Sequence, residues 1–140
     1  MDKFVFLEHT ADVLFESSGF SFEEALENAA LAMFSTIADA DKLSTLKDVE
    51  VEERAETLEE LAAYTLSDLL YEGQSNELFF KDFKITEFKK AGQGYLLKGR
   101  ARGSPMNPQT GKTDVKAVTH HECKVRQDEK LWKIKVLLDT

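Results

Sequence analysis

Two capping boxes, each at the start of a long amphipathic stretch, constrain the fold of this chain more than any other feature. In the segment Ser21–Glu24 (SFEE), the serine hydroxyl can accept a hydrogen bond from a helix amide while Glu24 reaches back to an earlier amide. The segment Thr57–Glu60 (TLEE) repeats the pattern. Apolar residues follow both segments at helical spacing, as far as about Asp39 and Gly73. The sequence therefore predicts two amphipathic helices.

Most of the remaining chain alternates apolar and polar residues, which is typical of β-strands. We expect strands near residues 3–7, 13–15, 49–52, 78–88, 95–102, 115–125 and 131–138. The first is apolar almost throughout, which predicts a strand covered on both faces. Tight turns are expected at 91–94 and 127–130, and a surface loop at 103–111. The predicted fold is α+β: a single domain over residues 1–140, with one mostly antiparallel sheet and two helices packed on one face.

Charge is distributed unevenly along the sequence. The formal net charge is −8, but residues 1–76 carry 18 acidic and 4 basic side chains, whereas residues 77–140 carry 8 and 14. A surface polarised in this way favours oriented docking on a charged partner over general nucleic-acid binding. The alternative is that the two helices simply carry glutamates on their solvated faces.

Composition also limits the classes of protein to consider. Cys123 is the sole cysteine, which excludes an internal disulfide and any cysteine-cluster metal site. No apolar run approaches the length of a membrane span, and the first residues lack a signal-peptide pattern. We therefore expect a cytoplasmic protein.

Two aspartates at opposite ends of the sequence form a candidate metal site. Asp12 comes shortly after the first apolar run, and Asp139 is followed by Thr140, whose terminal carboxylate would add another negative group. If the first and last strands are neighbours, these groups converge at the rim of the sheet. Such a cluster is costly unless a cation occupies it, and a hard cation with oxygen ligands is the natural occupant. The alternative is two unrelated, solvated aspartates.

Other candidate residues do not assemble a catalytic site. His9, His120 and His121 do not suggest zinc, because adjacent residues of a strand point to opposite faces. We expect His120 to be exposed, His121 to be half-buried, and Cys123 to be a packing residue. Lys116 follows the long loop, where its ammonium group could engage a phosphate or a carboxylate; the alternative is a solvated lysine. Motifs for a nucleophile, a phosphate loop or a dinucleotide site are missing from the sequence, so we expect no enzyme activity.

Four short motifs, in order along the chain, resemble those of the archease family. They are Glu8–Val13 (EHTADV), Leu69–Tyr71 (LLY), Lys116–His121 (KAVTHH) and the terminal segment from Trp132 to Asp139. The resemblance covers essentially the whole chain. It implies a strand-helix-strand-strand type domain with a second helix and added strands.

The resemblance also implies a function. Archeases are non-catalytic activators of the RtcB-type, GTP-dependent ligase that joins tRNA halves; they promote its guanylylation and turnover and broaden its use of nucleoside triphosphates. The implied metal ligands are Asp12, Asp139 and Thr140, holding a divalent cation such as calcium, and His9 and Lys116 are the implied partner-contact residues. We expect a monomer that binds the ligase, with neither stable nucleic-acid binding nor membrane contact.

The alternative function is a protein chaperone or modulator of an RNA-modifying enzyme such as a tRNA methyltransferase. A chaperone needs an exposed apolar patch. We expect this chain to lack one, because the helix stripes and strand faces account for its apolar residues.

Overall fold

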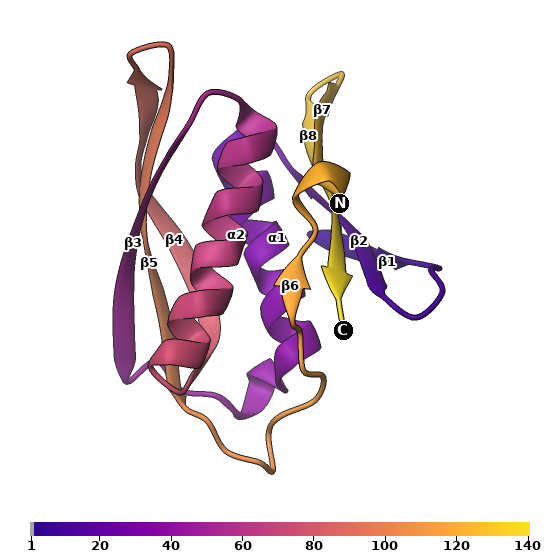
Figure 1. Ribbon diagram of the computed structural model, residues 1–140, viewed down its shortest axis with the longest axis vertical. Coiled ribbons are helices and arrows are strands. Elements are labelled where there is room, and N and C mark those ends of the chain that lie inside the picture. The colour runs from indigo at the N-terminus through magenta and orange to yellow at the C-terminus, as the bar shows by residue number, and fades with distance from the viewer. Residues whose placement is uncertain (1) are drawn as a thin grey trace.

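Two helices lie between two β-sheets in the computed structural model, which describes residues 2–140 (Figure 1). Helix α1 (Phe22–Ile37) and helix α2 (Leu58–Ser75) both begin where the capping boxes predict. The amide of Glu24 donates to Ser21 Oγ (3.1 Å), and the Glu24 carboxylate accepts from the Phe20 amide (2.8 Å). The amide of Glu60 donates to Thr57 Oγ1 (3.1 Å) in the same way. Within residues 2–140, neither helix is long and apolar enough to cross a membrane.

The first sheet joins the two ends of the chain. Its strands run in the order β1 (Phe4–Leu7), β2 (Val13–Gly19), β8 (Leu131–Asp139) and β6 (Ala117–Val118), and β7 (Lys124–Asp128) pairs with another part of β8. The second sheet has the order β3 (Lys47–Ala55), β5 (Gly94–Pro105) and β4 (Leu78–Ala91). Every strand pair described is antiparallel.

The α+β class with two helices is confirmed, but the prediction of one sheet is wrong. Helix α1 packs on β2 and β8 of the first sheet and on β4 of the second. It can do so because its buried residues surround most of its circumference, and small residues such as Ala25, Ala29, Ala30 and Ala32 let strands approach from both sides. Helix α2 packs on β3 and on β6 (Figure 1). One continuous core results, with helices shared by both sheets.

The predicted strand at 115–125 is also wrong. The structure has the two-residue strand β6, a 3₁₀-turn at His120–Glu122 and then β7. The buried residues of this segment are Val115, Val118 and Cys123, a spacing that no single strand can bury on one face. His121, expected to be half-buried, is therefore exposed on the turn.

The first strand is an edge strand and is not covered on both faces as predicted. Within the described residues, β1 pairs with β2 and with no other strand. Helix α1 lies mainly against β2 and β8, so the side chains of Val5, Phe6 and Leu7 remain 43%, 52% and 38% exposed. The expectation that all apolar residues are used in packing is wrong for the same reason.

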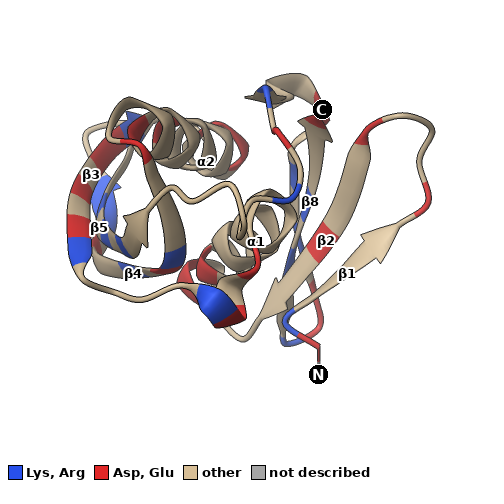
Figure 2. Cartoon of the chain, turned by 90° about the horizontal axis from the view of Figure 1, so that it is seen from below, with Lys and Arg blue, Asp and Glu red and all other residues tan. Residues whose placement is uncertain are grey.

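The charge asymmetry of the sequence is partly offset in the second sheet, where acidic residues of β3 lie beside basic residues of β5 (Figure 2). Basic strand β5 lies between β3 and β4, and Arg100 contacts Glu50 of β3 with an N–O distance of 2.6 Å. Arg102 contacts Asp82 of β4 through two hydrogen bonds, of 3.0 Å and 2.6 Å. These exposed pairs contribute little stability; Arg100 and Glu50 come from the basic and acidic halves of the sequence, whereas Arg102 and Asp82 both come from the basic half.

A pair of acids between β3 and α2 predicts that stability depends on pH. Burial raises the pKa of Glu53 from 4.5 to about 7, helped by a hydrogen bond that the protonated Glu53 side chain donates to Asp68 and by the negative charge of Asp68. The folded state thus binds this proton more tightly than the unfolded state, so its contribution to stability is complete below about pH 4.5 and is lost as the pH rises through about 7. We expect Glu53→Gln to raise the melting temperature more at pH 8 than at pH 5. Thermal unfolding of this variant and of exposed Glu52→Gln tests this; an equal change at both pH values would contradict it.

Candidate functional site

The start of β2 and the end of β8 meet at one end of the first sheet, which we call the tip (residues 8–12, 116, 139 and 140). Val13 pairs with Leu138, so the antiparallel register places Asp12 opposite Asp139. Odd-numbered residues of β2 and even-numbered residues of β8 face the core. Asp12 and Asp139 therefore both lie on the outer face of the sheet, where Asp139 is exposed and Asp12 partly exposed. Two carboxylates more than a hundred residues apart in sequence thus occupy adjacent positions.

Thr140 closes the tip against the loop between β1 and β2. Its hydroxyl donates to the carbonyl of Ala11 (3.1 Å). Ala11 has a φ of 72°, in the left-handed region, and the next amide, of Asp12, donates back to the carbonyl of Thr10 (2.8 Å). This strained turn directs the chain into β2 at Asp12, and such strain is frequent at functional sites.

The two other predicted contact residues lie on the segments that border these carboxylates. His9 is exposed on the loop between β1 and β2, with its Nδ1 3.1 Å from the Thr10 carbonyl. Lys116 lies just before β6 instead of within a long strand, and its amide donates to the carbonyl of Asp139 (2.8 Å). Its exposed side chain thus extends from a backbone that is fixed to the tip.

The carboxylates and main-chain carbonyls of the tip supply oxygen donors, and His9 is the one side chain of the tip with an imidazole nitrogen. Among residues 2–140, no three His, Cys, Asp or Glu side chains gather into a group that could hold a metal ion. The tip instead combines the Asp12 and Asp139 carboxylates with nearby main-chain oxygens such as that of Ala11. This set fits a hard divalent cation that keeps several waters, such as calcium or magnesium, and it lacks the nitrogen and sulfur ligands that zinc prefers.

The remaining histidines and the cysteine have local structural contacts. His120 Nε2 lies 2.8 Å from Ser67 Oγ of α2, and its ring packs near Tyr64. Burial raises the pKa of the Cys123 thiol to about 12. The thiol is therefore protonated at neutral pH and is a poor nucleophile, as its predicted packing role requires.

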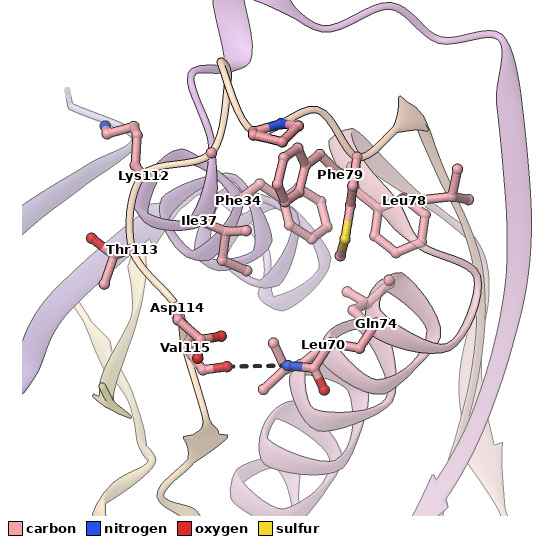
Figure 3. A pocket seen from close by; sticks show the side chains of 16 residues that line it. Phe34, Ile37, Leu70, Gln74, Leu78, Phe79, Lys112, Thr113, Asp114 and Val115 are labelled. Atoms are coloured by element: carbon pink, nitrogen blue, oxygen red, sulfur yellow. Dashed lines mark hydrogen bonds between the residues drawn. The ribbon is translucent and has the colours of Figure 1, made fainter.

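A pocket that the sequence analysis missed lies where the two helices end (Figure 3). It has a volume of about 320 Å³ and mainly apolar walls that include Phe34, Leu70 and Phe79. Gln74 Nε2 donates to the carbonyl of Val115 (3.2 Å) across one side of it (Figure 3). Three distant segments form this pocket, so no local sequence pattern indicates it.

One segment connects this pocket to the tip. Residues 111–115 form a wall of the pocket, held to the last turn of α1 where the amides of Lys112 and Thr113 donate to the carbonyls of Ile37 and Thr36. The next residue is Lys116, whose backbone amide donates a hydrogen bond to the carbonyl of Asp139. The position of the tip lysine is therefore set in part by packing at the pocket.

The sequence is similar to a known protein family over nearly its whole length. The sequence model of the Archease protein family (MTH1598/TM1083) matches residues 4–140. The chain is 37% identical to Protein archease of Methanosarcina mazei over 139 residues, covering 98% of this chain and 95% of that protein. It is 36% identical to Protein archease of Sulfolobus acidocaldarius over 141 residues, covering 99% of both.

Two solved structures share the fold. The solution structure of Methanobacterium thermoautotrophicum protein 1598 superposes with a TM-score of 0.86 at 31% identity, covering 100% of both chains. The crystal structure of an archease from Thermotoga maritima, described as a possible chaperone, gives a TM-score of 0.58 at 27% identity, covering 96% of this chain and 94% of that one.

Proposed function

The chain belongs to the archease family, and from this premise we propose that it is a non-catalytic activator of an RtcB-type, GTP-dependent tRNA-splicing ligase. In this role it promotes guanylylation of the ligase, restores multiple turnover and broadens the nucleoside triphosphates that the ligase accepts. The observation that carries the proposal is the pairing of Val13 with Leu138, which places Asp12 and Asp139 next to each other at an exposed tip. A projecting pair of carboxylates can enter a partner's site, whereas a catalytic cleft would need them recessed.

The residues of the tip have distinct tasks in this proposal. Asp12 and Asp139 hold a divalent cation, most favourably calcium, together with main-chain oxygens at Thr140 and Ala11. When bound, this cation supplies positive charge that offsets the charge of a triphosphate. Lys116 offers a second positive charge from a backbone anchored to Asp139. His9 contacts the partner from the border of the tip.

Calcium binding provides a direct prediction. We expect Asp12→Ala to weaken calcium binding at least about tenfold, because affinity for hard cations depends on the number of charged oxygen ligands. Isothermal titration calorimetry measures this, with Asp41→Ala as a control, since Asp41 is an exposed acid outside the tip, on the turn after α1. Calcium affinity that is the same in Asp12→Ala as in the native protein would remove Asp12 from the metal site.

The function itself is tested by a guanylylation assay of the cognate ligase with GTP, in the presence and absence of this protein. We expect the ligase to gain rate and turnover when the protein is added. The protein alone should neither hydrolyse nucleotides nor join RNA. Either activity alone, or an unchanged ligase rate, would refute the proposal.

A second candidate is a chaperone that holds a client such as an RNA-modifying enzyme. The exposed side chains of Val5, Phe6 and Leu7 favour it, because a patch of this kind can hold unfolded apolar segments. A holding chaperone acts at about one molecule per client, and this stoichiometry separates it from an activator.

A further inference from the structure

Strand β1 concentrates exposed apolar surface beside the tip. The exposed large hydrophobic residues of the described chain are few, and three of them, Val5, Phe6 and Leu7, are consecutive. Val5 and Leu7 lie on the outer face of the sheet and Phe6 on the face toward the core, so this edge is apolar on both sides. Single exposed apolar side chains are ordinary, but neighbouring ones mark an interaction site. Phe6 is 52% exposed even though its ring packs edge-on against Phe4 and Phe15.

The backbone of β1 has an open side as well. The Ser18 amide donates to the carbonyl of Lys3 (2.9 Å), so these two residues form a hydrogen-bonded pair. Such pairs alternate along an antiparallel ladder, and the amides and carbonyls of Phe4 and Phe6 therefore point away from β2. Natural edge strands are usually protected by charges, prolines or bulges, and the segment from Phe4 to Leu7 has none of these within it.

The apolar surface continues directly into the acidic tip. Leu7 pairs with Leu14 and Leu14 pairs with Leu137, which forms a row across three strands on the outer face of the sheet. Leu14 and Leu137 are partly exposed. Asp12, one residue before β2, and Asp139, at the end of β8, are the next outward-facing positions beyond this row. A protein that contacts the two carboxylates therefore has the leucine row and the open edge of β1 within its reach.

We propose that the open edge of β1 receives an extended segment of the same protein partner that the tip engages, which adds a strand to the first sheet. This inference rests on the proposed function and deepens it. The incoming segment makes main-chain hydrogen bonds with Phe4 and Phe6 and places an apolar side chain on the leucine row. Its sequence therefore alternates apolar residues with others.

A second copy of this chain is the other possible occupant, but the area does not suffice. Pairing of β1 with β1 of another molecule would involve four residues on each side. Such a contact is far smaller than the roughly 800 Å² per partner of a stable interface. A contact of this size is effective as one part of a larger interface, and the adjacent tip supplies the rest.

Two variants test the proposal through different atoms. Leu7→Lys places a charge on the leucine row, and Phe6→Pro removes an amide that faces the open side while sparing the pairing with β2. Leu46→Lys is the matched control, because Leu46 is 81% exposed just before β3 in the other sheet. We expect both β1 variants to raise the dissociation constant for the ligase at least about tenfold, and the control to leave it unchanged. Native-like affinity in folded Leu7→Lys would overturn the proposal, even if Phe6→Pro fails to fold.

Hydrogen exchange distinguishes strand addition from other contacts. The amides of Phe4 and Phe6 should exchange quickly in the free protein and become protected in the complex. Exchange of these amides that stays fast in the complex would overturn the proposal. Light scattering tests the other occupant: a dimer of the free protein that the Phe6→Pro substitution dissociates would also overturn the proposal.

If the native protein stimulates the ligase and Asp12→Ala does not, while both β1 variants bind the ligase normally, the proposed function stands and this inference alone fails. If the native protein does not stimulate the ligase, the proposed function fails.

Discussion

Replacing either tip aspartate with alanine is expected to reduce ligase guanylylation to the rate of the ligase alone. Asp12 and Asp139 come from opposite ends of the sequence and meet at adjacent register positions, so each variant removes half of the carboxylate pair. The remaining carboxylate cannot hold a hard cation firmly, since affinity depends on the number of charged oxygen ligands. The assay is single-turnover guanylylation of the ligase with each variant at saturating concentration.

Loss of stimulation must be separated from loss of folding. Both aspartates lie outside the core at the ends of strands, and exposed substitutions of this kind usually change stability by less than about 0.5 kcal/mol. Asp12→Asn preserves shape and removes the charge, so we expect it to fail as Asp12→Ala does. Lys116→Ala should reduce stimulation without affecting calcium binding. Full stimulation by a folded Asp12→Ala protein would refute the role of the tip, although the protein could still act through other surfaces.

The helices could be predicted because their signals are local. A capping box fixes where each helix begins, and the apolar spacing that follows fixes which side is buried. The same spacing does not say what covers that side. In α1 the buried alanines at 29, 30 and 32 lie on more than one face, which indicates packing between two layers, and one sheet was expected instead. The small size of these alanines was the sequence signal that could have indicated close packing of α1 on two sides.

The errors in the strands have a common cause. An apolar run shows that side chains avoid water, but it does not show that partners exist to cover them. Residues 4–7 form an edge strand because the sheet ends there, and exposed Val5 and Leu7 suit a partner. In residues 115–125, alternation of residue types suggested a strand, yet the buried positions are set by α2 and β8, which pack against this segment.

The candidate site could be predicted only on the condition that the strands next to the two aspartates are neighbours in the sheet. The sequence identifies two aspartates near the chain ends, but their convergence depends on strand order, which no local pattern reveals. The structure pairs β8 with β2 instead of β1, and this pairing brings Asp139 to Asp12. The pocket beside Gln74 and Val115 depends on three distant segments and left no pattern in the sequence.

Stimulation at substoichiometric amounts is the second large effect that we expect. An activator that docks, promotes guanylylation and leaves can serve many ligase molecules, so about one molecule per ten ligases should give nearly full guanylylation over several turnovers. Such an activator must leave the ligase quickly, and the dissociation rate accounts for most differences in affinity between related complexes. Titration of this protein against a fixed ligase concentration measures the effect.

Salt provides the control for that titration. Some exposed charges of the second sheet form ion pairs with one another, and the tip carries exposed carboxylates, so we expect part of the electrostatic attraction to come from the tip. Raising the ionic strength from about 0.1 M to about 1 M shortens the screening length from about 10 Å to about 3 Å and should slow association. A holding chaperone that binds through Val5, Phe6 and Leu7 would show little dependence on salt, because charge screening does not weaken the burial of apolar surface. Saturation at one molecule per ligase, with no effect of salt, would therefore favour the chaperone over the activator.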